Sequence, residues 1–174
     1  MPFPAFGQMN ASDPEAPFRQ TGWPGLRARL FHLYFLIRRP LTVGVRAVIL
    51  DREANAILLI RHTYVPGWQL PGGGVEVGET APRALERELV EECEIALTAP
   101  AELRSVHFNR LPSRRDHVLI YLVTDFQVLK PKAPDHEIAE AGFFPLDRLP
   151  DQTTPSTRRR LAEIFEGAPA SQYW

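Results

Sequence analysis

The stretch that decides the fold is GGVEVGETAPRALERELVEECEI, which runs from Gly73 to Ile95. A run of glycines opens it, and the residue pattern that follows predicts a helix over 81–93. Within that helix Glu88, Glu91 and Glu92 are spaced i, i+3 and i+4, so their side chains project from one face. The sequence therefore places concentrated negative charge directly after a glycine turn.

This negative charge is dense: seven acidic residues lie within 76–94, against only Arg83 and Arg87. A solvated helix face is the ordinary explanation of such a charge run. The glycines favour a different one, because a glycine turn lets the backbone approach a ligand or offer a carbonyl to a metal. Since Mg²⁺ binds carboxylate oxygens and is often shared with substrate phosphates, the segment predicts a metal site.

The same segment resembles the Nudix box, a family motif of fixed spacing. The matching positions are Gly73, Glu79, Arg87, Glu88, Leu89, Glu91, Glu92 and Ile95. One position departs, because the family usually has glycine where this chain has Glu94, and glycine there would form a left-handed helix cap. Glu94 therefore predicts either a different helix exit or mild strain.

The resemblance to Nudix hydrolases implies an α/β fold, an α/β/α sandwich with a central mixed β-sheet. The expected strands cover 42–50, 57–61, 68–70, 103–108 and 118–126, with a short apolar run at 142–145 and a last helix at 156–165. We divide the chain into a leader with a short amphipathic helix (1–40), a Nudix domain (41–166) and a C-terminal tail (167–174).

The resemblance also implies roles for the residues of the box. The implied ligands of Mg²⁺, or of Mn²⁺ in its place, are the carboxylates of Glu88, Glu91 and Glu92 and a backbone carbonyl near Gly73. Arg87 and Glu79 would hold the helix and the loop in register. The base that accepts a proton from the attacking water is either a box glutamate or Glu137, whose ordinary interpretation is a surface charge on a loop.

Candidate substrate contacts lie outside the box. They are Arg61, Tyr64, Trp68, Arg114 and Arg115. The aromatic rings, and Phe108 with them, fit stacking on a base as well as packing within the fold. The arginines of the 104–117 loop fit binding to phosphates as well as keeping a hairpin tip in water.

The predicted activity is hydrolysis of the diphosphate bond in a nucleoside diphosphate linked to another moiety. The alternative is a Nudix domain that binds a ligand as a sensor without turnover. Such domains tend to lose box glutamates, and here all are present, which favours the enzyme. Cys93, within the box, fits a small packed helix residue better than a nucleophile.

Composition limits the remaining classes of protein. The chain has 174 residues, 44% of them hydrophobic, and a formal net charge of −1, which indicates one soluble domain and argues against capture of duplex nucleic acid. A single cysteine allows no internal disulfide, so a cytoplasmic location is expected.

No apolar run reaches the roughly 20 residues that span a bilayer. The apolar stripe at 26–39 predicts a helix that packs on the domain or on a second copy in a homodimer, with membrane-surface binding as the minor alternative.

Overall fold

The computed structural model describes residues 41–110 and 114–174, so the predictions for 1–40 lie outside the described residues. The elements, in chain order, are β1 (Thr42–Asp51), β2 (Ala56–His62), β3 (Trp68–Gln69), α2 (Ala81–Cys93), β4 (Ile95–Leu97), β5 (Glu102–Asn109), β6 (Asp116–Val123), β7 (Phe126–Val128), β8 (Ile138–Pro145) and α3 (Pro155–Phe165). None of the described helices has the length and apolar character needed to cross a membrane.

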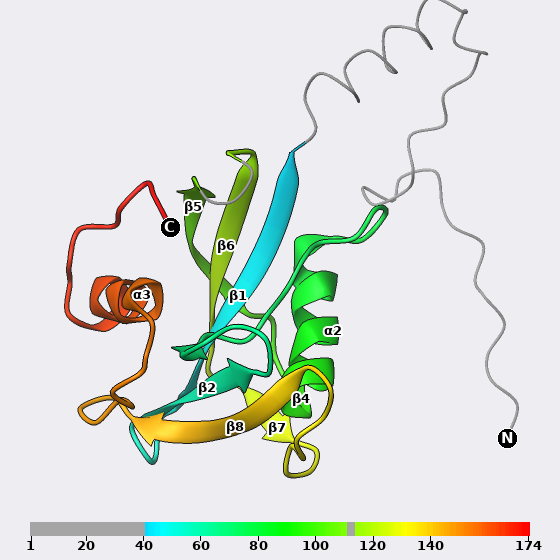
Figure 1. Cartoon of the computed structure of the whole chain (residues 1–174), viewed down its shortest axis with the longest axis vertical. Helices are drawn as coiled ribbons and strands as arrows, with labels where there is room; N and C mark the ends of the chain where they lie inside the picture. The colour runs from blue at the N-terminus through cyan, green and yellow to red at the C-terminus, as the bar shows by residue number, and fades with distance from the viewer. Residues whose placement is uncertain (1–40, 111–113) are drawn as a thin grey trace, which may run out of the picture. The chain divides into compact units, whose positions relative to one another are not determined.

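The central sheet is mixed, as predicted (Figure 1). Strand β1 runs parallel to β6, from Thr42 opposite Asp116 to Ile49 opposite Val123, and forms an antiparallel hairpin with β2. Strand β5 pairs with β6, while β3 and β8 both pair with β2. Because β1 and β2 pair only beside their shared turn, the two strands are free to diverge beyond it.

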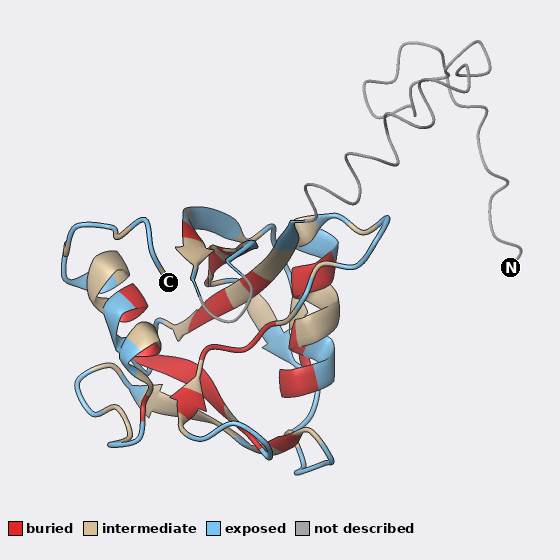
Figure 2. Cartoon of the chain, turned by 45° about the horizontal axis from the view of Figure 1, so that its top comes forward, coloured by how far each residue is buried: buried red, intermediate tan, exposed pale blue. Residues whose placement is uncertain are grey.

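Helices α2 and α3 cover opposite faces of this sheet (Figures 1 and 2). Side chains alternate across a strand, and accordingly Val45 and Ala47 of β1 belong to the core cluster that contains Leu89 of α2. Val48 belongs instead to the cluster that contains Leu161 of α3. The α/β/α sandwich expected from the Nudix resemblance is therefore the observed architecture.

The strand expected over 118–126 is two strands. Strand β6 ends at Val123, and β7 begins at Phe126 and leaves the main sheet to pair with β4. Strand β4 was not predicted, because three residues are too few to show a periodicity. The apolar run at 142–145 is the end of the longer strand β8.

Helix α2 covers the predicted range and ends at Cys93, which is buried in the core. The next residue, Glu94, has φ 56° and ψ 41°, and its N–H donates to the carbonyls of Leu89 and Val90. The helix therefore has the left-handed exit that glycine would give, and of the two alternatives for Glu94 the structure supports strain. Lys130 offsets part of that cost, since its Nζ lies 3.3 Å from the Glu94 carboxylate.

Candidate active site

The glycine loop lies along β1 and forms one wall of the candidate site. Backbone hydrogen bonds from Ala47 to the carbonyl of Pro71 and from Val45 to the carbonyl of Gly73, both 2.9 Å long, hold it there. Gly72 has φ +131°, and a side chain at this position would overlap the carbonyl of Val45. Glycine is therefore required at 72, and the loop sits closer to β1 than any other residue would allow.

Glu92 connects this loop to helix α2. Its side chain is buried, and its Oε2 accepts a hydrogen bond of 2.6 Å from the N–H of Gly72. Burial raises the pKa of Glu92 to about 7, although the Gly72 N–H and the charge of Arg46 both oppose that rise. A carboxyl group this poorly hydrated is poised to bind a cation or to exchange a proton near neutral pH.

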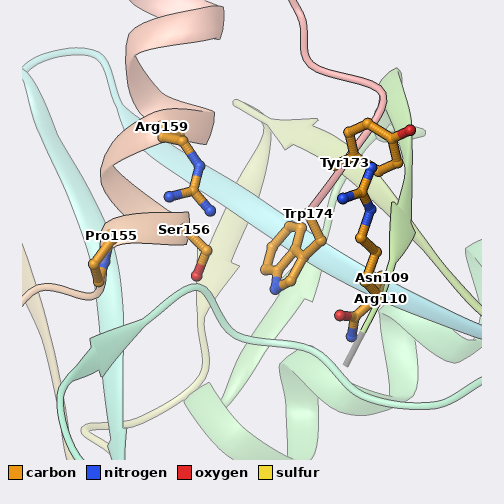
Figure 3. A pocket seen from close by; sticks show the side chains of 7 residues that line it. All are labelled: Asn109, Arg110, Pro155, Ser156, Arg159, Tyr173 and Trp174. Carbon is orange, nitrogen blue, oxygen red and sulfur yellow. The ribbon is translucent and has the colours of Figure 1, made fainter. Parts of the chain in front are cut away.

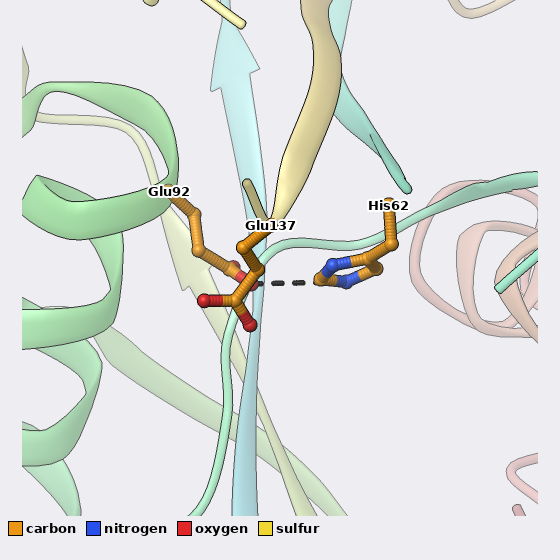
Figure 4. Close-up of side chains that lie close together, drawn as sticks. All are labelled: His62, Glu92 and Glu137. Carbon is orange, nitrogen blue, oxygen red and sulfur yellow. Dashed lines mark ion pairs between the residues drawn. The ribbon is translucent and has the colours of Figure 1, made fainter. Parts of the chain in front are cut away.

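Two further side chains face Glu92 from outside the helix (Figure 4). His62, at the end of β2, places its Nε2 3.7 Å from Glu92 Oε1. Glu137, just before β8, completes a set in which one ligand atom from each residue lies within 4.8 Å of the others. Burial, followed by the charge of Arg46, lowers the pKa of His62, so its ring is neutral at pH 7 and has a lone pair for a metal.

Arg87 organises the opposite side of the site. Its guanidinium donates to Glu79 at 3.1 Å, to Glu88 at 2.8 Å, to Glu91 at 3.2 Å and to the carbonyl of Gly74 at 3.0 Å. The hydrogen bond to Glu79 is the main cause that raises the pKa of Arg87. This arginine therefore connects the loop to the helix and partly neutralises two of the predicted metal ligands.

Glu88 lies directly beneath the loop. A methyl group added at Gly73 would overlap its carboxylate, and burial is the main cause that raises the pKa of Glu88. The carbonyl of Gly73 already accepts the N–H of Val45, although a carbonyl oxygen has a second lone pair. Glu91 is the most open of the three box glutamates, with 59% of its side chain exposed.

The segment that carries Glu137 is fixed to α2 by two residues. Asp135 accepts the N–H groups of Glu137 and Ile138 at 2.8 and 2.7 Å. Lys132 donates both to Asp135 and to the carbonyl of Glu91, each at 2.6 Å. These contacts hold the Glu137 carboxylate near the C-terminal half of α2.

A comparison with protein families matches the NUDIX domain to residues 40–164. The chain belongs to this family. A candidate 8-oxo-dGTP diphosphatase of Bacillus subtilis is 30% identical over 73% of this chain and 82% of its own length. The ADP-ribose pyrophosphatase of Methanocaldococcus jannaschii is 34% identical over 72% of this chain and 73% of its own length.

Among solved structures, the MutT Nudix hydrolase of Burkholderia pseudomallei is 33% identical and superimposes with a TM-score of 0.58 over 71% of this chain and 97% of its own. Other curated Nudix relatives are longer, and the chain spans 48% and 44% of two of them. The expectation of a Nudix pyrophosphohydrolase is thus confirmed at the level of the family.

The candidate substrate residues fall into different environments within this Nudix fold. Tyr64 donates its hydroxyl to Glu137 at 3.1 Å and so borders the acidic site. Trp68 is only 8% exposed and packs edge-on against Phe144, 4.7 Å between ring centroids, so the packing interpretation holds for it. Arg61 forms a 3.0 Å ion pair with Glu140.

Arg114 and Arg115 lie exposed in the β5–β6 loop. Within the described ranges, no contact joins either of them to the acidic residues of α2. Their part in binding a Nudix substrate remains a prediction.

Sequence reasoning missed two residues of the site, His62 and Arg46. His62 is the last residue of a buried strand, and no local pattern distinguishes it. Arg46 carried a signal, since it is the one charge within the otherwise apolar strand TVGVRAVIL. Its Nη1 is buried and has no hydrogen-bond partner in the described part of the chain.

Proposed function

We propose that the chain is a divalent-metal-dependent Nudix hydrolase, with Mg²⁺ as the usual ion, that cleaves the diphosphate bond of a nucleoside diphosphate linked to another moiety. The observation that carries the proposal is the buried carboxylate of Glu92, which faces His62 and Glu137 beside the glycine loop. A buried carboxylate with a second carboxylate close by is costly unless a cation balances it.

The residues present fit such a cation. Glu92 would hold it together with His62, and Glu88 and Glu91 would turn from Arg87 to complete the set predicted from the box. Carboxylates suit Mg²⁺, whereas the imidazole suits Mn²⁺ at least as well, so we expect both ions to support activity. When bound, the ion supplies charge neutralisation at the diphosphate and a more acidic water.

We assign the general base to Glu137. It stands at the open side of the cluster, and Tyr64 donates a hydrogen bond to one of its oxygens, which leaves the other free to take a proton. Burial, followed by the contact with Glu137, raises the pKa of Tyr64, so the phenol keeps its proton and remains a donor. Asp135 and Lys132 would hold the backbone that carries this carboxylate beside α2.

The relatives support the substrate class. One is named for 8-oxo-dGTP and another for ADP-ribose, and both compounds contain a nucleoside joined to a phosphoanhydride. The moiety beyond the diphosphate is set by loops that differ among family members. Because Cys93 is the sole cysteine and is buried, we also expect the protein to work in the reducing cytoplasm, which cell fractionation would test.

The test is product release from a panel of nucleotides, ADP-ribose and 8-oxo-dGTP included, with Mg²⁺ or Mn²⁺. Glu92→Gln keeps the side-chain shape and an oxygen for the Gly72 N–H, so it should fold normally and lose activity by about 100-fold or more. Glu86→Gln, on the same helix and paired with Arg83, is the matched control and should retain activity. Equal rates for the two variants would refute the site, and tight binding without turnover on any substrate would favour a sensor.

A further inference from the structure

A second pocket, separate from the acidic cluster around Glu92, has no part in the proposed hydrolysis. It has a volume of about 650 Å³ and lies between the end of β5, the first turns of α3 and the last two residues of the chain. Figure 3 shows Arg159 reaching in from α3, Arg110 and Tyr173 on the other side, and the indole of Trp174 between them. This volume falls in the range of small-molecule sites, about 300 to 1,000 Å³.

The charged side chains that line this pocket are both basic. Arg110 and Arg159 both line it, and no acidic side chain does. In the described portion of the structure, neither guanidinium has a carboxylate within ion-pair distance. Arg110 lies over the ring of Tyr173, 3.5 Å from the ring centroid, which holds its planar group in place. Two arginines without carboxylate partners, beside a concave surface, favour an anionic ligand.

The N-terminal turn of α3 adds to this positive field. Pro155 is the first helical residue, and Ser156 lines the pocket with its hydroxyl. Arg159 lies one turn further along the same 11-residue helix, so the positive end of the helix dipole borders the pocket.

Several contacts fix the aromatic wall of the pocket to β5 and α3. Phe108 of β5 receives the N–H of Trp174 at 3.1 Å and donates to the carbonyl of Gln172 at 2.8 Å, so the chain end runs along this strand. The guanidinium of Arg160, which is fully buried, lies 5.6 Å over the indole of Trp174 and donates to the carbonyl of Tyr173. The half-buried indole also packs against the core cluster that contains Leu161 and lines the pocket, so its ring is already ordered for stacking at little entropic cost.

The pocket lies on the face of the sheet opposite the acidic residues. Its helix, α3, packs on the cluster around Val48, whereas α2 packs on the cluster around Ala47. None of its lining residues also lines the depression at 61–67 that borders His62. A ligand bound here is therefore not the diphosphate held at Glu92.

We propose that this pocket is a second binding site, for a nucleoside monophosphate or a closely similar phosphate with one flat ring. Arg159 and Arg110 take the phosphate next to the α3 N-terminus, and the base stacks on Trp174. Stacking on an aromatic platform combined with arginine contacts to phosphate is a general means of holding nucleotides. Such a ligand lacks a diphosphate and is not a substrate for the α2 site.

The test is calorimetric titration of the full chain with AMP in the presence of EDTA, next to inorganic phosphate, ribose 5-phosphate and adenosine. We expect AMP to bind at least about tenfold more tightly than any of its parts. Arg159→Gln and Trp174→Leu should each weaken AMP about tenfold, as expected for loss of a charge-assisted hydrogen bond or a stacked ring. Arg104→Gln, on the same strand as Asn109 but paired with Glu102, is the matched control and should bind as wild type.

Location is checked by hydrogen exchange and by Glu92→Gln, which should bind AMP normally. AMP should protect the amides of 109–110, 156–159 and 171–174. Absence of AMP binding, wild-type affinity in both pocket variants, or protection confined to 61–67 and 88–92 would each overturn the proposal. Equal affinity for AMP and ribose 5-phosphate would overturn its nucleoside part. None of these outcomes depends on whether the chain hydrolyses a diphosphate.

Discussion

The backbone N–H of Gly72 donates to the carboxylate of Glu92 over 2.6 Å, inside the protein. This bond connects a loop that only glycine can form to a helix residue whose pKa lies near 7. The position of the loop and the protonation of the site are therefore coupled through one contact.

That coupling predicts how stability varies with pH in the absence of divalent ions. Because burial raises the pKa of Glu92 from 4.5 to about 7, its contribution to stability is complete below pH 4.5 and is lost as pH rises through 7. The free energy of unfolding of wild type, relative to Glu92→Gln, should fall by about 2 to 3 kcal/mol over that window. The lowered pKa of His62 acts in the opposite direction, but it is common to both proteins. Denaturant titrations with EDTA would measure the difference, and parallel pH profiles would contradict it.

The two neighbouring glycines of the loop should respond differently to alanine. A methyl group at Gly73 overlaps the Glu88 carboxylate, whereas one at Gly74 meets nothing within 4 Å. Because the tip of Glu88 can move aside, Gly73→Ala should fold, yet displace this proposed metal ligand and reduce the hydrolysis rate by about 100-fold. Gly74→Ala should retain wild-type rates and melting temperature. Similar rates in both variants would show that hydrolysis does not depend on the observed position of the Glu88 carboxylate.

Lys132 should affect catalysis without touching substrate. Its side chain is 9% exposed and connects the carbonyl of Glu91 to Asp135, which in turn fixes Glu137. We expect Lys132→Met to lower kcat about tenfold and leave KM nearly unchanged, since it displaces the proposed base, Glu137, and leaves the substrate contacts in place. Lys130→Met removes a 68% exposed lysine two residues earlier and serves as the control. A rise in KM alone would assign Lys132 to binding.

The backbone at Glu94 predicts an unusual order of stability. Glycine adopts the observed left-handed conformation freely, whereas alanine is penalised by about 1 kcal/mol. Both substitutions remove the ion pair with Lys130, so their difference isolates the backbone. Glu94→Gly should therefore be more stable than Glu94→Ala by about 1 kcal/mol in chemical denaturation, and the reverse order would contradict the assigned conformation.

Local patterns were sufficient for the helix and for the family. The bounds of α2 and the paired strands β1 and β2 follow from periodicity and turn residues within short windows, which contacts elsewhere in the chain did not override. The break between β6 and β7 was not visible, because β7 is held by β4 and not by its own sequence.

The site could be predicted only as a set of residue types. The i, i+3 and i+4 spacing on one helix face suggested that Glu88, Glu91 and Glu92 act together, yet Glu92 turns to the buried side while the other two contact Arg87. The orientation of each glutamate side chain depends on the loop at Gly72 and on His62. Only the folded sheet brings these residues close to α2. A local sequence pattern does not encode distances between residues that are far apart in the chain.

The parallel pairing of β1 with β6 has a kinetic consequence. Thr42 lies opposite Asp116, and they are separated by 74 positions along the chain. Closing a loop of that length is slow compared with forming a helix or a hairpin, because its entropy is lost before its contacts are gained. If β1 is ordered only once β6 joins it, the glycine loop that rests on β1 takes shape late in refolding. If metal is added to the unfolded chain, α2 would then form well before the glycine loop completes the proposed metal site.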